Sequence, residues 1–248
     1  MAELAQQHDL AGIWDDTPID TALTHIGLLV TAGEDAMLSF AQLIVANHTP
    51  LYTFQPVARF GLECLALAHW LCEPGIGARE RVRRSLNERL ASAYEQTRLP
   101  EGMNPEPQRN ERLLAATALG FKVHSRKGRL SVLGQERPTI TRHVQDVLGH
   151  DRLGKVMYSF TSAVSHGTLW GLVESLQPPH GTPREPVVTV PLVISSDRIA
   201  NAALALTYAH MRSYDRLINY LGWPNEAWAD AYSTTLAEIN HHLVGRRK

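Results

Sequence analysis

The sequence predicts a mostly α protein: a single-domain helical bundle over residues 18–244 with a minor short β-hairpin or edge segment, preceded by a loose lead-in at 1–17. Apolar residues recur every three or four positions through most of the chain, which is the period of an amphipathic helix. Short stretches rich in proline and glycine separate these runs, as expected for helices joined by tight turns. Strand-like patterns are confined to 121–133 and 187–194.

Each predicted element has a local signal. Asp16-Thr17-Pro18 is a helix start, with proline near the first helical position. Gly128 lies between two short alternating runs, which predicts a hairpin or an ordered loop. Ser195-Ser196-Asp197 is the N-terminal cap of a long helix that runs to about 221. The other helices are predicted over 18–46, 54–72, 78–97, 108–119, 139–148, 152–176 and 225–244.

The amino-acid composition limits where the protein is expected in the cell and which partners it is expected to bind. The formal net charge of -1 gives no overall attraction to nucleic acid or to an anionic membrane, so such a partner requires a local basic patch. Cys64 and Cys72 are eight residues apart on one predicted helix, about 12 Å, which is too far for a disulfide between them. They indicate buried, reduced thiols in a cytoplasmic protein. No signal peptide and no membrane-spanning helix are expected.

The most informative stretch of the chain is a polar stripe. Tyr158, Ser162, His166 and Trp170 recur every four residues, so a continuous helix would present them on one face. Hydroxyl and imidazole groups on a largely apolar helix need hydrogen-bond partners. The stripe is therefore either a catalytic or ligand-binding site or a satisfied polar seam in the core, and the spacing leaves both open.

Charged residues suggest two further places to look. Arg59 and Glu63 are four apart on an apolar helix, which predicts either a core ion pair or the wall of a binding pocket. The helix over 78–97 carries several arginines, Arg89 among them, interleaved with glutamates. A solvated face is the simpler interpretation of that helix, and phosphate binding is the alternative.

A third pattern in the sequence has the spacing of metal ligands on a helix. Glu238 and His241 have the Glu-x-x-His spacing that forms half of a di-metal carboxylate site in helical bundles. The sequence offers no second half, so a solvated face is the better interpretation. No zinc, dinucleotide or P-loop motif is present, and we expect neither a metal nor a cofactor.

The helix that ends in His166-Gly167, together with the Tyr-x-x-x-Ser-x-x-x-His pattern and the Arg59-x-x-x-Glu63 pair, resembles the helical domains of the HEPN superfamily over about residues 54–176. HEPN ribonucleases carry an arginine four to six residues before the histidine. The residues here are Phe160, Thr161 and Ser162, so the resemblance does not extend to the ribonuclease motif. The resemblance implies a helical bundle, a homodimer, and a role in nucleic-acid handling, cellular defence or a toxin–antitoxin system.

Three functions follow from these observations. The first is a HEPN-like protein that binds RNA or a nucleotide near Arg59, Glu63, Ser162 and His166. The second is a small-molecule enzyme in which His166 acts as general base, with Tyr158 or Ser162 orienting the substrate. The third is a non-catalytic, dimeric interaction module. Whether the protein is an enzyme stays open.

A homodimer is also predicted from the C-terminal helices, whose large apolar and aromatic residues exceed what one helix face usually needs. The alternative is that other helices of the same chain cover them. The residues concerned are Tyr208, Met211, Tyr214, Leu217, Ile218, Tyr220, Leu221, Trp223 and Trp228.

Overall fold

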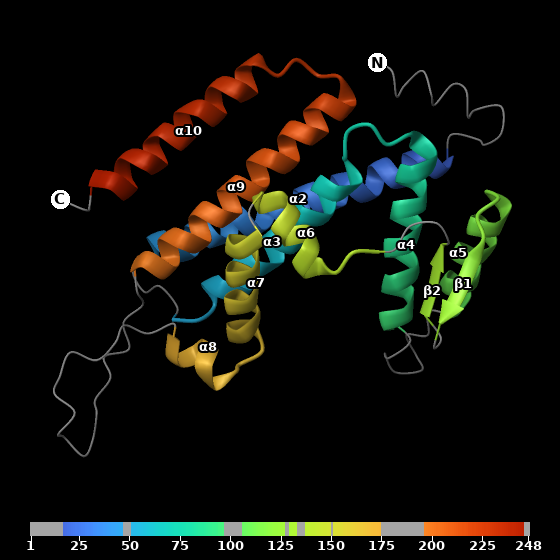
Figure 1. The fold of residues 1–248 in the computed structure, drawn as a ribbon, viewed down its shortest axis with the longest axis horizontal. Helices are drawn as coiled ribbons and strands as arrows, with labels where there is room; N and C mark the ends of the chain where they lie inside the picture. Colours follow the sequence, from blue (N-terminus) through green and yellow to red (C-terminus); the bar gives the residue numbers. More distant parts are fainter. Residues whose placement is uncertain are drawn as a thin grey trace. The chain divides into compact units, whose positions relative to one another are not determined.

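The computed structural model describes residues 17–46, 51–96, 106–126, 129–132, 137–149, 151–174 and 196–245. Over these residues the chain is mostly helical, with one two-stranded hairpin (Figure 1). The predicted mostly α fold class is confirmed, and the predicted helix boundaries agree with the observed ones within two residues, except over 152–176. The predicted extended segment at 187–194 lies outside the described residues.

The chain divides into two compact units. Unit 1 comprises Met1–Leu28, Leu71–Thr139 and Tyr220–Gly222, and unit 2 comprises Leu29–Trp70, Ile140–Asn219 and Trp223–Lys248. Helix α2 (Thr17–Val45) contributes its first part to unit 1 and the remainder to unit 2. The two units are described separately below.

Unit 1 is built on helix α4 (Ala78–Gln96), with α5 (Glu106–Ala118) and the hairpin formed by β1 (Val123–Arg126) and β2 (Arg129–Val132). The strands are antiparallel, with Val123 opposite Val132, as the alternation around Gly128 predicts. The backbone amide of Val132 donates to Oδ1 of the buried Asn87 at 2.6 Å, which fastens β2 to α4. The core of this unit consists of Ile19, Ala22, Ala78, Val82, Leu86, Leu90, Ala116, Phe121 and Val132.

Unit 2 contains α3 (Phe54–Leu71), α6 (Ile140–Leu148), α7 (Asp151–Ser165), α8 (Leu169–Glu174), α9 (Ser196–Leu221) and α10 (Glu226–Gly245). Helix α3 supplies more of its fully buried side chains than any other described helix, because apolar residues occupy most of its faces. The core of unit 2 includes Phe40, Phe54, Ala58, Leu62, Leu65, Ala66, Val144, Val147, Leu148, Met157, Ala202, Ala205, Leu206 and Ala209.

The prediction of one helix over 152–176 is wrong, because the chain turns after Ser165 and a separate helix begins at Leu169. Gly167 has φ +63°, in the left-handed region that favours glycine. Its amide donates to the carbonyl of Val164 at 2.9 Å, and the amide of Thr168 donates to that of Ala163 at 3.0 Å. These two bonds form a Schellman motif, which ends a helix by satisfying its last carbonyls.

The two cysteines behave as predicted: Cys64 and Cys72 are buried and are not joined in a disulfide. Burial raises the pKa of the Cys64 thiol to about 11, so this thiol is protonated at neutral pH. Among the described helices, α2 is long and apolar enough over Pro18–Val45 to cross a membrane by length and composition. Core helices of soluble proteins pass the same test, so this property does not distinguish a span from a core helix.

The apolar residues of α9 and α10 that predict a dimer are partly covered inside unit 2. Met211 and Ile218 are buried, and the rings of Tyr214 and Trp228 lie 4.7 Å apart between centroids. Trp223, in contrast, is 55% exposed. Dimerisation stays a prediction, and light scattering over a range of protein concentrations tests it.

Candidate functional site

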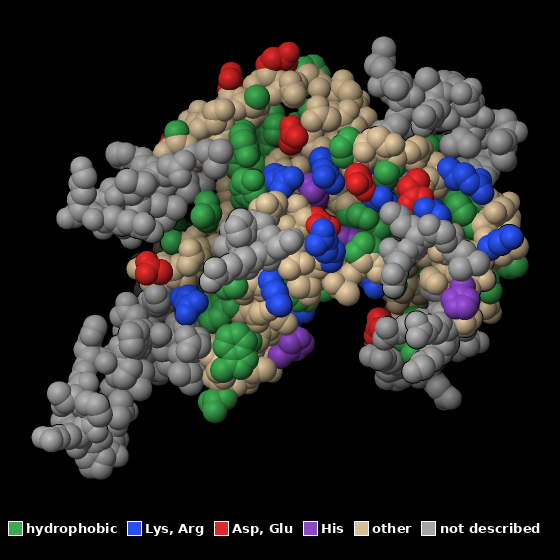
Figure 2. All heavy atoms as spheres, in the orientation of Figure 1, with side chains coloured by type: hydrophobic (Ala, Val, Ile, Leu, Met, Phe, Trp, Pro, Cys, Tyr) green, Lys and Arg blue, Asp and Glu red, His purple; other side chains and the backbone are tan. Residues whose placement is uncertain are grey.

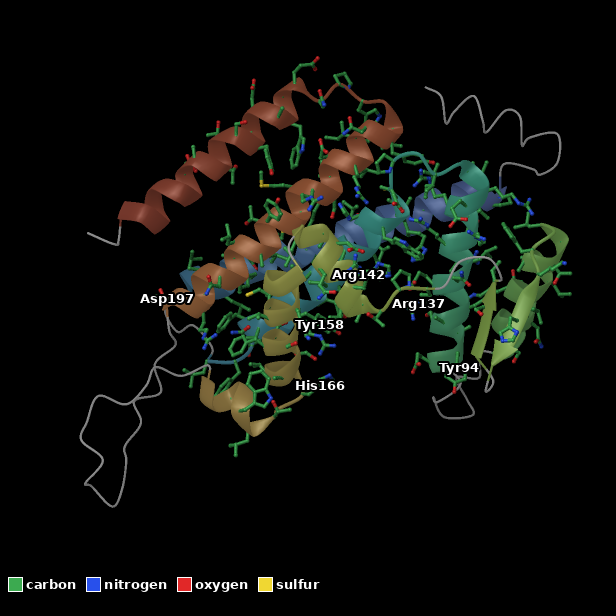
Figure 3. The ribbon with its side chains drawn as sticks, in the orientation of Figure 1. Tyr94, Arg137, Arg142, Tyr158, His166 and Asp197 are labelled. Atoms are coloured by element: carbon green, nitrogen blue, oxygen red, sulfur yellow. The ribbon has the colours of Figure 1, made fainter. Side chains whose placement is uncertain are left out.

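Four of the residues singled out in the sequence meet around one guanidinium in unit 2. Nε of Arg59 donates to Oε1 of Glu63 at 2.7 Å, and Nη2 donates to the hydroxyl of Tyr158 at 3.3 Å. Nη1 of Arg59 lies 3.2 Å from Nε2 of His166. We call Arg59, Glu63, Tyr158 and His166 the Arg59 cluster. It joins α3 to α7, and Figure 3 shows Tyr158 along α7 and His166 at the end of that helix.

Local sequence explains how each side chain reaches the cluster. Arg59 and Glu63 are neighbours on α3 because residues four apart lie one above the other on a helix. Tyr158 lies in the middle of α7, two turns before its end. His166 follows the last residue of α7 and is held there by the Schellman motif at Gly167, which leaves its side chain exposed.

The contact with Arg59 fixes the tautomer that His166 adopts. A guanidinium only donates hydrogen bonds, so Nε2 accepts here, and the neutral ring carries its proton on Nδ1. Three of the five N–H donors of Arg59 are used by Glu63, Tyr158 and His166. Two guanidinium N–H groups and the Nδ1–H of His166 are thus available to an acceptor from outside, counted over the part of the chain that the structure describes.

The electrostatics of the cluster keep both Arg59 and Tyr158 protonated. Burial alone would lower the pKa of Arg59, but the hydrogen bond and the charge of Glu63, with Tyr158, raise it above its ordinary value. Burial raises the pKa of Tyr158, and the carboxylate of Glu63 raises it further, against the opposing charge of Arg59. Tyr158 is therefore a neutral phenol at physiological pH, and the Arg59–Glu63 pair carries no net charge.

The other predicted site residues lie outside this hydrogen-bonded group. Ser162 is half-buried on α7, and its carbonyl accepts from the backbone amide of His166 at 3.0 Å. Trp170 is 52% exposed on α8, and its ring lies 6.2 Å from that of Phe160. Arg89 belongs to unit 1, where burial lowers its pKa and its carbonyl accepts from Nη1 of Arg112 at 2.7 Å.

The Glu-x-x-His spacing of Glu238 and His241 is not joined by further metal ligands among the described residues. Glu238 is exposed on α10, and the side chain of His241 lies outside the described residues. In the part of the chain that the structure describes, no group of three or more His, Cys, Asp or Glu side chains is arranged to hold a metal ion.

Sequence reasoning missed Gln55. This residue lies one turn before Arg59 on α3 and is 0% exposed, and both polar atoms of its amide lack a hydrogen-bond partner among the described residues. Buried amides are normally satisfied, so this one marks a polar position beside an apolar core. The signal in the sequence is the continuation of the four-residue spacing from Gln55 through Arg59 to Glu63.

The exposed surface next to the cluster is apolar. Figure 2 shows hydrophobic side chains gathered over α8, beside a histidine. The residues of this patch include Leu169, 78% exposed, and Trp170. Helix α8 packs closely on α7, because a Cβ on Gly171 would lie 2.7 Å from the backbone carbon of Ala163. An indole is thereby held on a short helix directly after the histidine.

Comparison with known proteins identified no relative. No family model matches the chain, and neither a curated protein nor a solved structure is detectably similar to it.

Proposed function

We propose that the Arg59 cluster binds a phosphate group of RNA or of a nucleotide, in a HEPN-like protein whose setting is cellular defence or a toxin–antitoxin system. The observation that carries the proposal is one guanidinium held by two helices, with two N–H donors left over beside an exposed imidazole. Phosphate oxygens accept several hydrogen bonds, and arginine is the side chain best suited to donate them.

The cluster favours a short ligand. Glu63 neutralises Arg59, so binding depends on directed hydrogen bonds at close range rather than on a broad positive field. A long nucleic acid needs many basic contacts along its backbone. A nucleotide or a short single strand needs only one phosphate here, which agrees with a formal net charge of -1.

Trp170 supplies a second element of recognition. Exposed aromatic rings are stacking platforms for unpaired bases, and each stack contributes about 1–3 kcal/mol. The indole of Trp170 is half exposed and supported by Phe160, whose ring centroid also lies 4.5 Å from the guanidinium carbon of Arg198. The proposal assigns the phosphate to Arg59 and His166 and the base to Trp170.

The test measures binding of AMP and of a short fluorescein-labelled single-stranded RNA by calorimetry and anisotropy at low ionic strength. Arg59→Gln should weaken binding at least about tenfold, because a hydrogen bond to a charged group is lost. Arg142→Gln is the matched control: Arg142 also forms an i,i+4 ion pair, with Asp146 at 3.0 Å, on another helix of the same unit. That variant should bind as the unchanged protein does.

The salt dependence provides a second measurement. A single phosphate contact to a single strand predicts a slope of about -0.7 for log K against log salt concentration. A much steeper slope would indicate many basic contacts and move the site away from the Arg59 cluster. Absence of binding to both probes, or equal losses in Arg59→Gln and Arg142→Gln, would contradict the proposal and leave the cluster as a structural ion-pair network.

A further inference from the structure

A second site is suggested by a cavity of about 330 Å³ in unit 2, which the proposed function does not use. Three elements line it: the last turn of α3, the C-terminal half of α9 and the first turns of α10. Figure 2 shows hydrophobic side chains between α9 and α10, with basic side chains close by. The volume is at the lower end of the range for small-molecule pockets.

Two arginines of α9 form the polar wall of this cavity. Nη1 of Arg212 donates to the carbonyls of Asp146 at 3.3 Å and Val147 at 3.1 Å, in the last turn of α6. Nη1 of Arg216 donates to the carbonyl of His69 at 2.8 Å, in the last turn of α3. Because these helix-end carbonyls hold one arm of each guanidinium, the charges stay in place before any ligand arrives.

The charge balance of the lining is positive. Asp215 is the one carboxylate among the lining residues, against Arg212 and Arg216. His69 adds no charge: burial, with the nearby charges of Arg216 and Arg212, lowers its pKa to about 3. Counted over the lining residues alone, two guanidinium groups stand against one carboxylate, and Arg212 is the arginine that we assign to an anionic ligand.

His69 also has an unmet hydrogen-bonding requirement. Its side chain is 3% exposed, and Nε2 has no hydrogen-bond partner among the described residues. A buried polar atom without a partner is uncommon in folded proteins, so the position of His69 is an unusual one for an imidazole. His69 is among the lining residues, so its ring lies beside the cavity, although the Nε2 atom itself is enclosed by protein.

The other residues that line the cavity indicate what kind of ligand would fit beside the charged group. Tyr208, Met211, Trp228 and Tyr232 give the cavity a largely aromatic and apolar surface. The amide of Ala229 donates to the carbonyl of Asn225 at 2.8 Å, so the first turn of α10 begins at the cavity. The first amides of a helix have no partner within it and favour an anion nearby.

We propose that this cavity binds a small organic carboxylate with a flat, aromatic body. The carboxylate is held by Arg212, with Arg216, His69 and the N-terminal turn of α10 around it, and the ring lies against Trp228. The site is independent of the Arg59 cluster: on α3, His69 lies ten residues beyond Arg59, about 15 Å along the helix axis. Each site can therefore fail its test without affecting the other.

The experiment follows the Trp228 indole signal in spectra of ¹⁵N-tryptophan-labelled protein during titration with indole-3-acetate, benzoate, phenylacetate and 3-phenylpropionate, each paired with its neutral amide. At least one carboxylate should shift the Trp228 signal, and its amide should bind at least about tenfold more weakly because the charge-assisted hydrogen bonds are lost. The signal is assigned from its disappearance in Trp228→Phe.

Three variants test the location and the charge of the site. Ala227 and Ala229 are both exposed on α10, but only Ala229 lines the cavity. Ala229→Phe should therefore abolish binding, whereas Ala227→Phe should leave it unchanged. Arg212→Gln should weaken carboxylate binding about tenfold. If no carboxylate shifts the Trp228 signal, if amides bind as well as carboxylates, or if Ala229→Phe and Ala227→Phe bind alike, the proposal is overturned.

Discussion

Gly167 determines where α7 ends and where His166 lies, so Gly167→Ala tests the geometry of the candidate site. Apart from its neighbours in the chain, no atom of the described residues lies within 4 Å of a Cβ built at this position, so an alanine meets no steric obstacle from them. The only penalty is conformational, since φ of +63° is unfavourable for a residue with a Cβ.

The magnitude follows from that conformation. A non-glycine residue in the left-handed region costs about 1–2 kcal/mol. For a chain of this size, each kcal/mol lowers Tm by about 2–4 °C, which gives an expected decrease of about 2–8 °C. Gly167→Asn should lower Tm by less than Gly167→Ala does, because asparagine tolerates the left-handed region better than alanine does.

Gly27→Ala is the matched control. At Gly27, too, no atom of the described residues beyond its own helix lies within 4 Å of a built Cβ, but Gly27 lies within α2 and has no positive φ. Alanine in a helix interior is more stable than glycine by about 0.5–1 kcal/mol. The two identical substitutions should therefore shift Tm in opposite directions in differential scanning calorimetry.

A neutral or stabilising Gly167→Ala would refute the Schellman ending of α7, and with it the position of His166 beside Arg59. The imidazole signals of His166 supply a second readout, because strain at Gly167 should change its contact with Arg59 while leaving the other histidines unaffected. Unchanged His166 signals together with a lowered Tm would show that the cluster survives the strain.

Two further outcomes are expected. Leu62→Ala removes a side chain that is 0% exposed in the core of unit 2 and should cost about 2–5 kcal/mol by denaturant titration, whereas Leu28→Ala, at a position that is 66% exposed, should change stability by less than about 0.5 kcal/mol. The pKa of His69 falls from 6.5 unfolded to about 3 folded, so the unfolded state binds more protons between these values and stability falls as the pH is lowered through that window, by up to about 1.4 kcal/mol per pH unit. His69→Gln should reduce this slope between about pH 7 and about pH 5, and an unchanged slope would contradict the assigned burial.

Local signals predicted most of the secondary structure. The predicted helix starts near Pro18 and Ser196, and the predicted hairpin over 121–133, depend on residues adjacent in the chain. The structure agrees over the described residues: α2 begins at Thr17, α9 begins at Ser196, and β1 pairs with β2. The break at Gly167 was missed because the apolar and small residues on either side keep the helical spacing. Only the backbone conformation of Gly167 shows that it ends one helix rather than lying inside a longer one.

The sequence alone determined the Arg59–Glu63 pair, because residues four apart on a helix are neighbours whatever surrounds them. It also placed Tyr158 on a second helix, whereas the structure places His166 directly after the end of that helix. Tertiary structure decided that these two helices meet, so that side chains about 100 residues apart share one guanidinium. The cavity around His69 likewise exists only because α3, α9 and α10 pack together. Spacing fixes contacts within a helix, whereas contacts between helices follow from which apolar faces are buried against one another.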